Sequence, residues 1–101
     1  MSSPSPEEEK LPGEKVLKHA CKLSIEHDKP IMMDYWSDSV SSEPSVLIGV
    51  RGNDEKMLVR SSEEYTSPIS KIFRVASEFI VITENSIYIV GASIPTKRIT
   101  S

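Results

Sequence analysis

His19, Cys21 and His27 lie close together in the sequence, and these residue types bind metals and catalyse nucleophilic reactions. A structural zinc site needs four ligands, usually in two closely spaced pairs, and this stretch offers three without such pairing. A cysteine nucleophile needs a base and a third group that orients the base, and neither that group nor a glycine-rich turn accompanies Cys21 and His19. The stretch therefore predicts neither a metal site nor a catalytic thiol, and we expect Cys21 to be a small buried side chain.

Two further pairs of residues could take part in acid–base catalysis or in phosphate binding. Asp34 and Asp38 could form a carboxylate pair, but the pattern places them at a strand end and in a solvated loop. Gly49 and Gly52 fall in a strand and in its turn, whereas a phosphate-binding glycine loop precedes a helix. We therefore predict that the protein is not an enzyme and has no cofactor.

The charge of the chain is concentrated at its N-terminus. The formal net charge is −3, and residues 1–14 account for all of it, because four glutamates there face one lysine. This stretch of Ser, Pro and Glu predicts a disordered acidic tail, and residues 15–101 predict a single small domain. A neutral domain with an acidic tail disfavours nucleic-acid binding, since phosphate backbones attract clustered Lys and Arg.

Hydropathy and cysteine content indicate the compartment. No apolar run approaches the roughly 20 residues that a membrane span requires, and the N-terminus lacks the layout of a signal peptide. The single cysteine excludes an internal disulfide, as is usual in a reducing compartment. These features predict an intracellular protein without a membrane partner.

Short apolar runs separated by polar turns dominate the chain after residue 30. They predict strands at 31–36, 46–51 and 57–60, followed by a three-stranded meander within 71–90. The whole pattern predicts an all-β or mainly β fold with one short N-terminal helix. We expect a small SH3-like, partly open barrel of five or six antiparallel strands, with an OB-like barrel as the alternative.

Residues 15–25 fit two secondary structures. As a strand they alternate between apolar and polar side chains, with His19 as an exception. The β-rich remainder favours a short helical turn that leads into a strand at residues 22–26. As a helix the segment would carry one apolar stripe, formed by Leu17, Ala20, Cys21, Ser24 and Ile25.

The sequence EFIVITENSIYIV predicts a hairpin with a two-residue loop at Glu84 and Asn85. Side chains two residues apart share a face, so the hairpin has two apolar faces. The first is an isoleucine face of Ile80, Ile82, Ile87 and Ile89, which predicts the core. The second is an aromatic face of Phe79, Val81, Tyr88 and Val90.

A solvated second face would be polar, so the aromatic face must be covered. Three alternatives remain for what covers the aromatic face: the amphipathic segment 15–25, a partner protein or second copy, and closure of the barrel. Segment 15–25 is favoured, since it needs no association.

Trp36 is the only tryptophan, and on the predicted strand 31–36 it shares a face with Asp34. An outward-facing Asp34 would leave Trp36 partly exposed beside a long loop, whereas a tryptophan at the barrel end would be mostly buried. We favour the buried arrangement of Trp36. A partly exposed Trp36 would suit peptide recognition. The candidate interaction surface therefore comprises Trp36, Phe79, Val81, Tyr88 and Val90.

The strings DKPIMMDYW, EEYTSPISKIFRV and EFIVITENSIYIV resemble short, uncharacterised single-domain proteins encoded by large nucleocytoplasmic DNA viruses. The resemblance spans about residues 22–99 and brings no catalytic or binding residues with it. It implies an infected-cell or virion setting, in the cytoplasm or nucleus of the host cell or in the virion itself.

Taken with the absence of catalytic motifs, these features predict a non-enzymatic protein-interaction or structural module, such as a virion or virus-factory component. Its partner would be another protein or a second copy of the chain. A nucleic-acid-associated small β-barrel is the alternative function.

Overall fold

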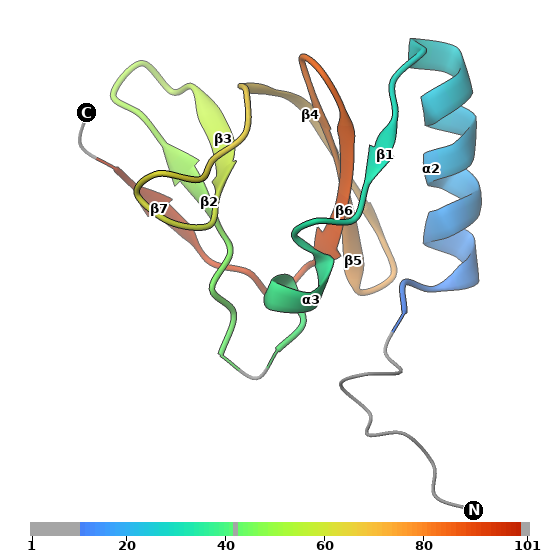
Figure 1. Ribbon diagram of the computed structural model, residues 1–101, viewed down its shortest axis with the longest axis horizontal. Coiled ribbons are helices and arrows are strands. Elements are labelled where there is room, and N and C mark those ends of the chain that lie inside the picture. The colour runs from blue at the N-terminus through green and yellow to red at the C-terminus, as the bar shows by residue number, and fades with distance from the viewer. Residues whose placement is uncertain (1–10, 42, 100–101) are drawn as a thin grey trace, which may run out of the picture.

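The computed structural model describes residues 11–41 and 43–99 (Figure 1). Residues 1–10 of the predicted tail lie outside the described residues. No helix among the described residues is long and apolar enough to cross a membrane. The elements are α2 (Glu14–His27), β1 (Ile31–Met32), α3 (Trp36–Ser39), β2 (Leu47–Val50), β3 (Lys56–Val59), β4 (Ile69–Val75), β5 (Glu78–Thr83), β6 (Ile87–Gly91) and β7 (Thr96–Arg98).

The seven described strands form two sheets. The four-stranded sheet has the order β1-β6-β5-β4, and the three-stranded sheet has the order β3-β2-β7. The prediction of a mainly β fold is confirmed. The prediction of purely antiparallel pairing is wrong, because β1 pairs with β6 and β7 pairs with β2 in parallel. The described strands form no closed barrel, so the SH3-like barrel is not confirmed.

The β5–β6 hairpin has the register that its sequence predicts. Ile82 pairs with Ile87 and Val81 with Tyr88, and the backbone N–H of Thr83 donates to the carbonyl of Ser86 at 2.9 Å. A two-residue loop therefore joins the strands, as two turn-forming residues between alternating strands predict. The predicted β2–β3 and β4–β5 hairpins are confirmed as well.

Both faces of this hairpin are covered, by different layers (Figure 1). Helix α2 and Trp36 pack on the isoleucine face. The three-stranded sheet packs on the aromatic face, so the prediction that segment 15–25 covers that face is wrong. The buried residues of the first layer are Val16, Ala20, Trp36, Ile80, Ile82, Ile87 and Ile89. Those of the second are Tyr35, Val46, Ile48, Leu58, Val81, Val90 and Ile94.

Segment 15–25 is helical throughout, so the predicted strand at residues 22–26 is wrong. The helix turns Val16 and Ala20 into the core, with Leu23 partly buried beside them. This i, i+4, i+7 stripe is typical of an amphipathic helix. The buried stripe lies on a different face from the predicted one, and three members of the predicted stripe, Leu17, Cys21 and Ile25, are exposed. The prediction that Cys21 is buried is therefore wrong.

The predicted strand 31–36 ends after Met32, and the chain turns into α3 at Trp36. The buried hydroxyl of Ser39 joins α3 to β6, because it donates to the carbonyl of Trp36 at 2.7 Å and accepts the backbone N–H of Gly91 at 2.9 Å. Gly91 permits this close approach, since a Cβ there would lie 2.9 Å from a methyl group of Val40.

Replacing this hydroxyl tests the junction. We expect Ser39→Ala to lower the free energy of unfolding by about 1–3 kcal/mol, because it leaves the buried N–H of Gly91 without an acceptor. Urea denaturation measures the change. Ser41→Ala is the matched control, because the Ser41 hydroxyl is exposed and bonds only locally. An equal, small effect of both substitutions would contradict the role of Ser39.

Candidate functional site

The residues predicted to form an interaction surface lie inside the protein. Trp36 is 4% exposed, and Val81 and Val90 are 0% exposed. Phe79 and Tyr88 are half-buried and pack against the cluster between the two sheets. Trp36 packs on the opposite face of the sheet, with the isoleucines. These residues therefore join layers of the fold and do not form one exposed surface.

Tyr35 and Tyr88 form an aromatic pair at the edge of the inter-sheet cluster, with ring centroids 5.4 Å apart. Burial raises the pKa of both phenols, and the charge of Asp34 raises the pKa of Tyr88 further. The Arg60 guanidinium lies 5.8 Å from the centre of the Tyr35 ring and forms an ion pair with Asp38 at 2.8 Å. A raised pKa keeps the phenols protonated, so this cluster supports packing and not phenolate chemistry.

The histidines and the cysteine that opened the sequence analysis all lie on α2, where Cys21 is exposed. Among residues 11–41 and 43–99, no group of three or more His, Cys, Asp or Glu side chains could hold a metal ion. His19 does line a groove, described below, but without a cysteine beside it.

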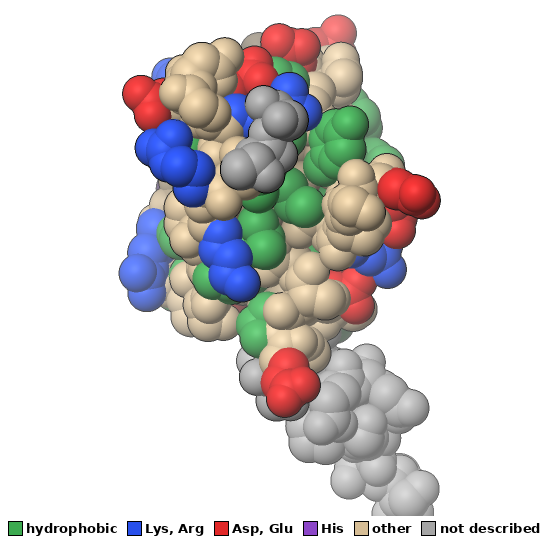
Figure 2. All heavy atoms as spheres, turned by 90° about the vertical axis from the view of Figure 1, so that its left-hand side faces the viewer, with side chains coloured by type: hydrophobic (Ala, Val, Ile, Leu, Met, Phe, Trp, Pro, Cys, Tyr) green, Lys and Arg blue, Asp and Glu red, His purple; other side chains and the backbone are tan. Residues whose placement is uncertain are grey.

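The outer face of the three-stranded sheet is one candidate binding surface (Figure 2). It has a hollow of about 530 Å³ that Met57, Tyr65, Arg51 and Arg98 help to line. Both arginines already face carboxylates, since Arg51 lies 3.7 Å from Glu55 and Arg98 lies 4.0 Å from Asp54. Figure 2 shows basic and acidic side chains around a hydrophobic centre. This mixture of charges is a poor match to a phosphate backbone.

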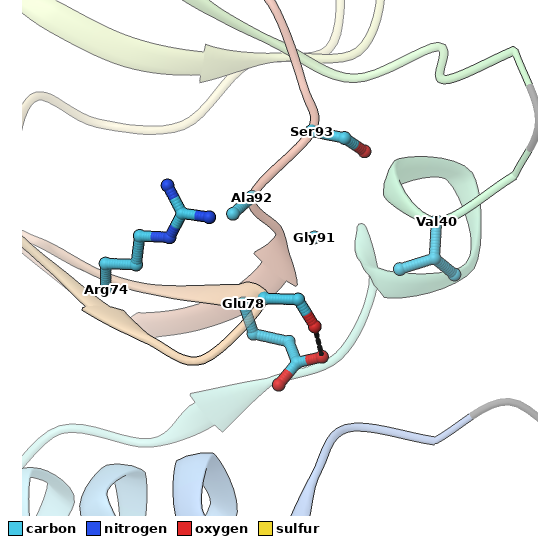
Figure 3. A pocket seen from close by; sticks show the side chains of 7 residues that line it. Val40, Arg74, Glu78, Gly91, Ala92 and Ser93 are labelled. Carbon is cyan, nitrogen blue, oxygen red and sulfur yellow. Dashed lines mark hydrogen bonds between the residues drawn. The ribbon is translucent and has the colours of Figure 1, made fainter.

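A second hollow opens beside α3, near the β4–β5 turn (Figure 3). Its volume is about 240 Å³, which is below the roughly 300 Å³ of the smallest usual ligand pockets. Arg74 and Glu78 carry opposite charges on its wall, and Glu78 accepts a hydrogen bond from Ser77 at 2.9 Å. The hollow therefore offers neither the volume nor a net charge for a specific ligand.

A groove of about 440 Å³ lies between α2 and β4, and it combines apolar and charged walls. Helix α2 contacts β1, β6 and β5 and covers the neighbouring face of β4 only in part, since Val75 packs against the cluster under the helix. As a result Phe73 is 39% exposed, although it pairs with the fully buried Ile80. The lining residues are His19, Lys22, Leu23, Glu26, Phe73, Arg74, Val75 and Ile80.

Strand β4 is also an edge of the four-stranded sheet. It pairs with β5 on one side, in a register that places Val75 opposite Glu78 and Phe73 opposite Ile80. In an antiparallel pair, alternate residues bond to the partner strand and the others point away. Since the residues that flank a two-residue turn bond to each other, the backbone groups of Ile72 and Arg74 point away from β5. The three-stranded sheet approaches this edge, since β3 contacts β4 and Lys56 and Ile72 line one hollow, but β4 pairs with no described strand on that side. The groove therefore adjoins an edge with backbone groups left for another strand.

The cations beside the groove differ in their pairing from Arg51, Arg60 and Arg98. Within residues 11–41 and 43–99, Arg51, Arg60 and Arg98 each form an ion pair with a carboxylate. In the same part of the chain, Lys22 and Arg74 form none. Arg74 donates instead to the backbone carbonyl of Ala76 at 3.1 Å. Unpaired positive charge therefore borders the groove.

This groove was not predicted from the sequence. The helical spacing of His19, Lys22 and Glu26 places them on one face of α2, beside the buried stripe. Because a strand was predicted at residues 22–26, this helical spacing was not recognised. The exposure of Phe73 follows from the edge position of β4, for which the sequence carries no local signal.

Comparison with known proteins gives no relative from which a function could be transferred. No family model matches the chain, and neither a curated protein nor a solved structure matches it. The resemblance to viral proteins therefore stays a prediction.

Proposed function

We propose that the protein is a non-enzymatic protein-interaction module that binds a partner through the groove between α2 and β4. The observation that carries this proposal is the exposed apolar floor of the groove, with Phe73 39% exposed beside a free strand edge. Apolar side chains in a concave site, with a few charged groups at the rim, are typical of binding sites for peptides and small ligands.

The setting predicted from the viral resemblance, a virion or an infected cell, belongs to the same proposal. So does the comparison with an SH3-like partly open barrel, which the contact between β3 and β4 across the two sheets supports. The nucleic-acid alternative has weaker support, because the arginines of the three-stranded sheet face carboxylates.

Selection of random displayed peptides against the full chain tests the proposal. We expect peptides that bind wild-type protein and lose about tenfold or more in affinity to Phe73→Ser, since a partly exposed aromatic residue in a groove is a typical hot spot. Fluorescence anisotropy of labelled peptides measures the affinities.

Ile25→Ser is the matched control, because Ile25 is 82% exposed on α2 and does not line the groove. It should leave the affinities unchanged. A selection that enriches no peptide, or one whose peptides bind Phe73→Ser as tightly as wild type, would contradict the proposal.

A further inference from the structure

We infer that the groove takes an extended, acidic segment of a partner protein, which joins the four-stranded sheet beside β4 as a fifth strand. This inference rests on the proposed function and specifies the chemistry of the partner.

The edge of β4 determines the conformation of the partner. The outward-pointing N–H and C=O groups of Ile72 and Arg74 need hydrogen-bond partners spaced as in a strand. An extended segment supplies them, whereas a helix bonds its own backbone groups internally. The groove then lies beside the added strand, on the face that carries Phe73.

The apolar floor determines where the partner needs apolar side chains. In an added strand alternate side chains point to the same face, so every second residue faces Phe73 and the helix. Phe73, Val75 and Leu23 offer an apolar surface to those residues, with the buried Ile80 beneath them. A large apolar side chain opposite Phe73 would cover the exposed part of its ring.

The charges determine the positions of the partner on either side of that apolar side chain. Lys22 and Arg74 line the groove against the single carboxylate of Glu26, and Lys71 lies two residues before Phe73 on the same face of β4. Lys22, Lys71 and Arg74 have no carboxylate partner within residues 11–41 and 43–99. Acidic side chains on the added strand would complement these three cations.

The same charges argue against a second copy of the chain as the occupant. The strand Ile69–Val75 carries Lys71 and Arg74 and no acidic residue. Antiparallel pairing of two such strands would bring cations from both copies together, and like charges on adjacent strands are destabilising.

A synthetic peptide with a central Phe and with Glu two residues before and two residues after it, so that all three side chains share the groove face, tests the inference, with copies that carry Gln or Lys in place of Glu. We expect the Glu peptide to bind the full chain at least about tenfold more tightly than the Lys copy, with the Gln copy between them. The preference should weaken as the salt concentration rises.

Substitutions on one helix separate the groove from the general charge of the protein. Lys22→Glu should remove most of the preference for the Glu peptide. Lys18→Glu makes the same charge change on α2, outside the groove lining, and should leave most of the preference in place.

Hydrogen exchange tests the strand addition. Binding of the Glu peptide should slow exchange of the Ile72 and Arg74 amides about tenfold or more, because both gain a hydrogen bond. Arg74→Pro, which lacks that N–H, should bind more weakly than Arg74→Gln, which keeps it. Thermal unfolding of each variant confirms that it folds.

The results distinguish this inference from the proposed function. Selected peptides that depend on Phe73 while the Glu peptide binds no better than its Lys copy would overturn the inference and leave the proposed function standing. Unchanged exchange at Ile72 and Arg74 would overturn the strand addition. A stable dimer of the free chain that Arg74→Pro disrupts and Arg74→Gln does not would replace the acidic partner with a second copy.

Discussion

Ile89→Ala should lower the free energy of unfolding by about 2–5 kcal/mol. Ile89 is fully buried on the central strand β6, in the cluster that includes Ile80, Val16 and Trp36. Truncation removes buried apolar area and leaves a cavity between the sheet and α2, which cannot collapse without moving the helix. Chemical denaturation measures the loss.

Ile25→Ala provides the baseline for this experiment, because Ile25 is 82% exposed on α2. Its effect should stay within about 0.5 kcal/mol. If Ile89→Ala cost no more than this control, the isoleucine face could not be the contact between the sheet and the helix.

Leu58→Ala should lower the free energy of unfolding by a similar amount, about 2–5 kcal/mol. This substitution tests the packing on the aromatic face of the hairpin. Leu58 is fully buried on β3, in the cluster with Val81 and Val90. The loss would report the packing of the three-stranded sheet on the aromatic face.

Leu11→Ala makes the same change at a residue that is 75% exposed, and it should alter stability by less than about 0.5 kcal/mol. A stability loss below about 1 kcal/mol for Leu58→Ala would contradict the cover that the three-stranded sheet provides. Large effects of both Ile89→Ala and Leu58→Ala would mean that the hairpin is buried on both faces.

The hairpin could be predicted from the sequence because the residues that determine its turn and its pairing are close together in the chain. Glu84 and Asn85 suit a tight turn, and the β-branched residues on both sides alternate from that point outward. Once the loop length is set, the pairing of Ile82 with Ile87 follows, and with it the composition of both faces.

The covering layers could not be predicted in the same way, because they depend on contacts between distant segments. The two-residue strand β1 and the three-residue strand β7 are too short to show a periodicity, and each pairs in parallel with a distant strand. The sequence of segment 15–25 fits both a helical and a strand periodicity. Its packing on the isoleucine face determines that the segment is a helix.

The candidate site could not be predicted from the sequence for a related reason. The strongest apolar pattern in the sequence is the one that the fold buries, so it does not mark the exposed apolar residues. Phe73 looks like an ordinary strand residue in the sequence, and it is exposed because α2 covers β4 only in part.

The central claim is that the protein binds its partner at the groove between α2 and β4. Nuclear magnetic resonance spectra of the amide groups, recorded during titration with a selected peptide, test it most directly. We expect shifts at Lys22, Leu23, Phe73 and Val75, and none at Arg51 or Arg98 on the three-stranded sheet. Shifts confined to Arg51, Tyr65 and Arg98 would contradict the claim and assign binding to the opposite side of the molecule.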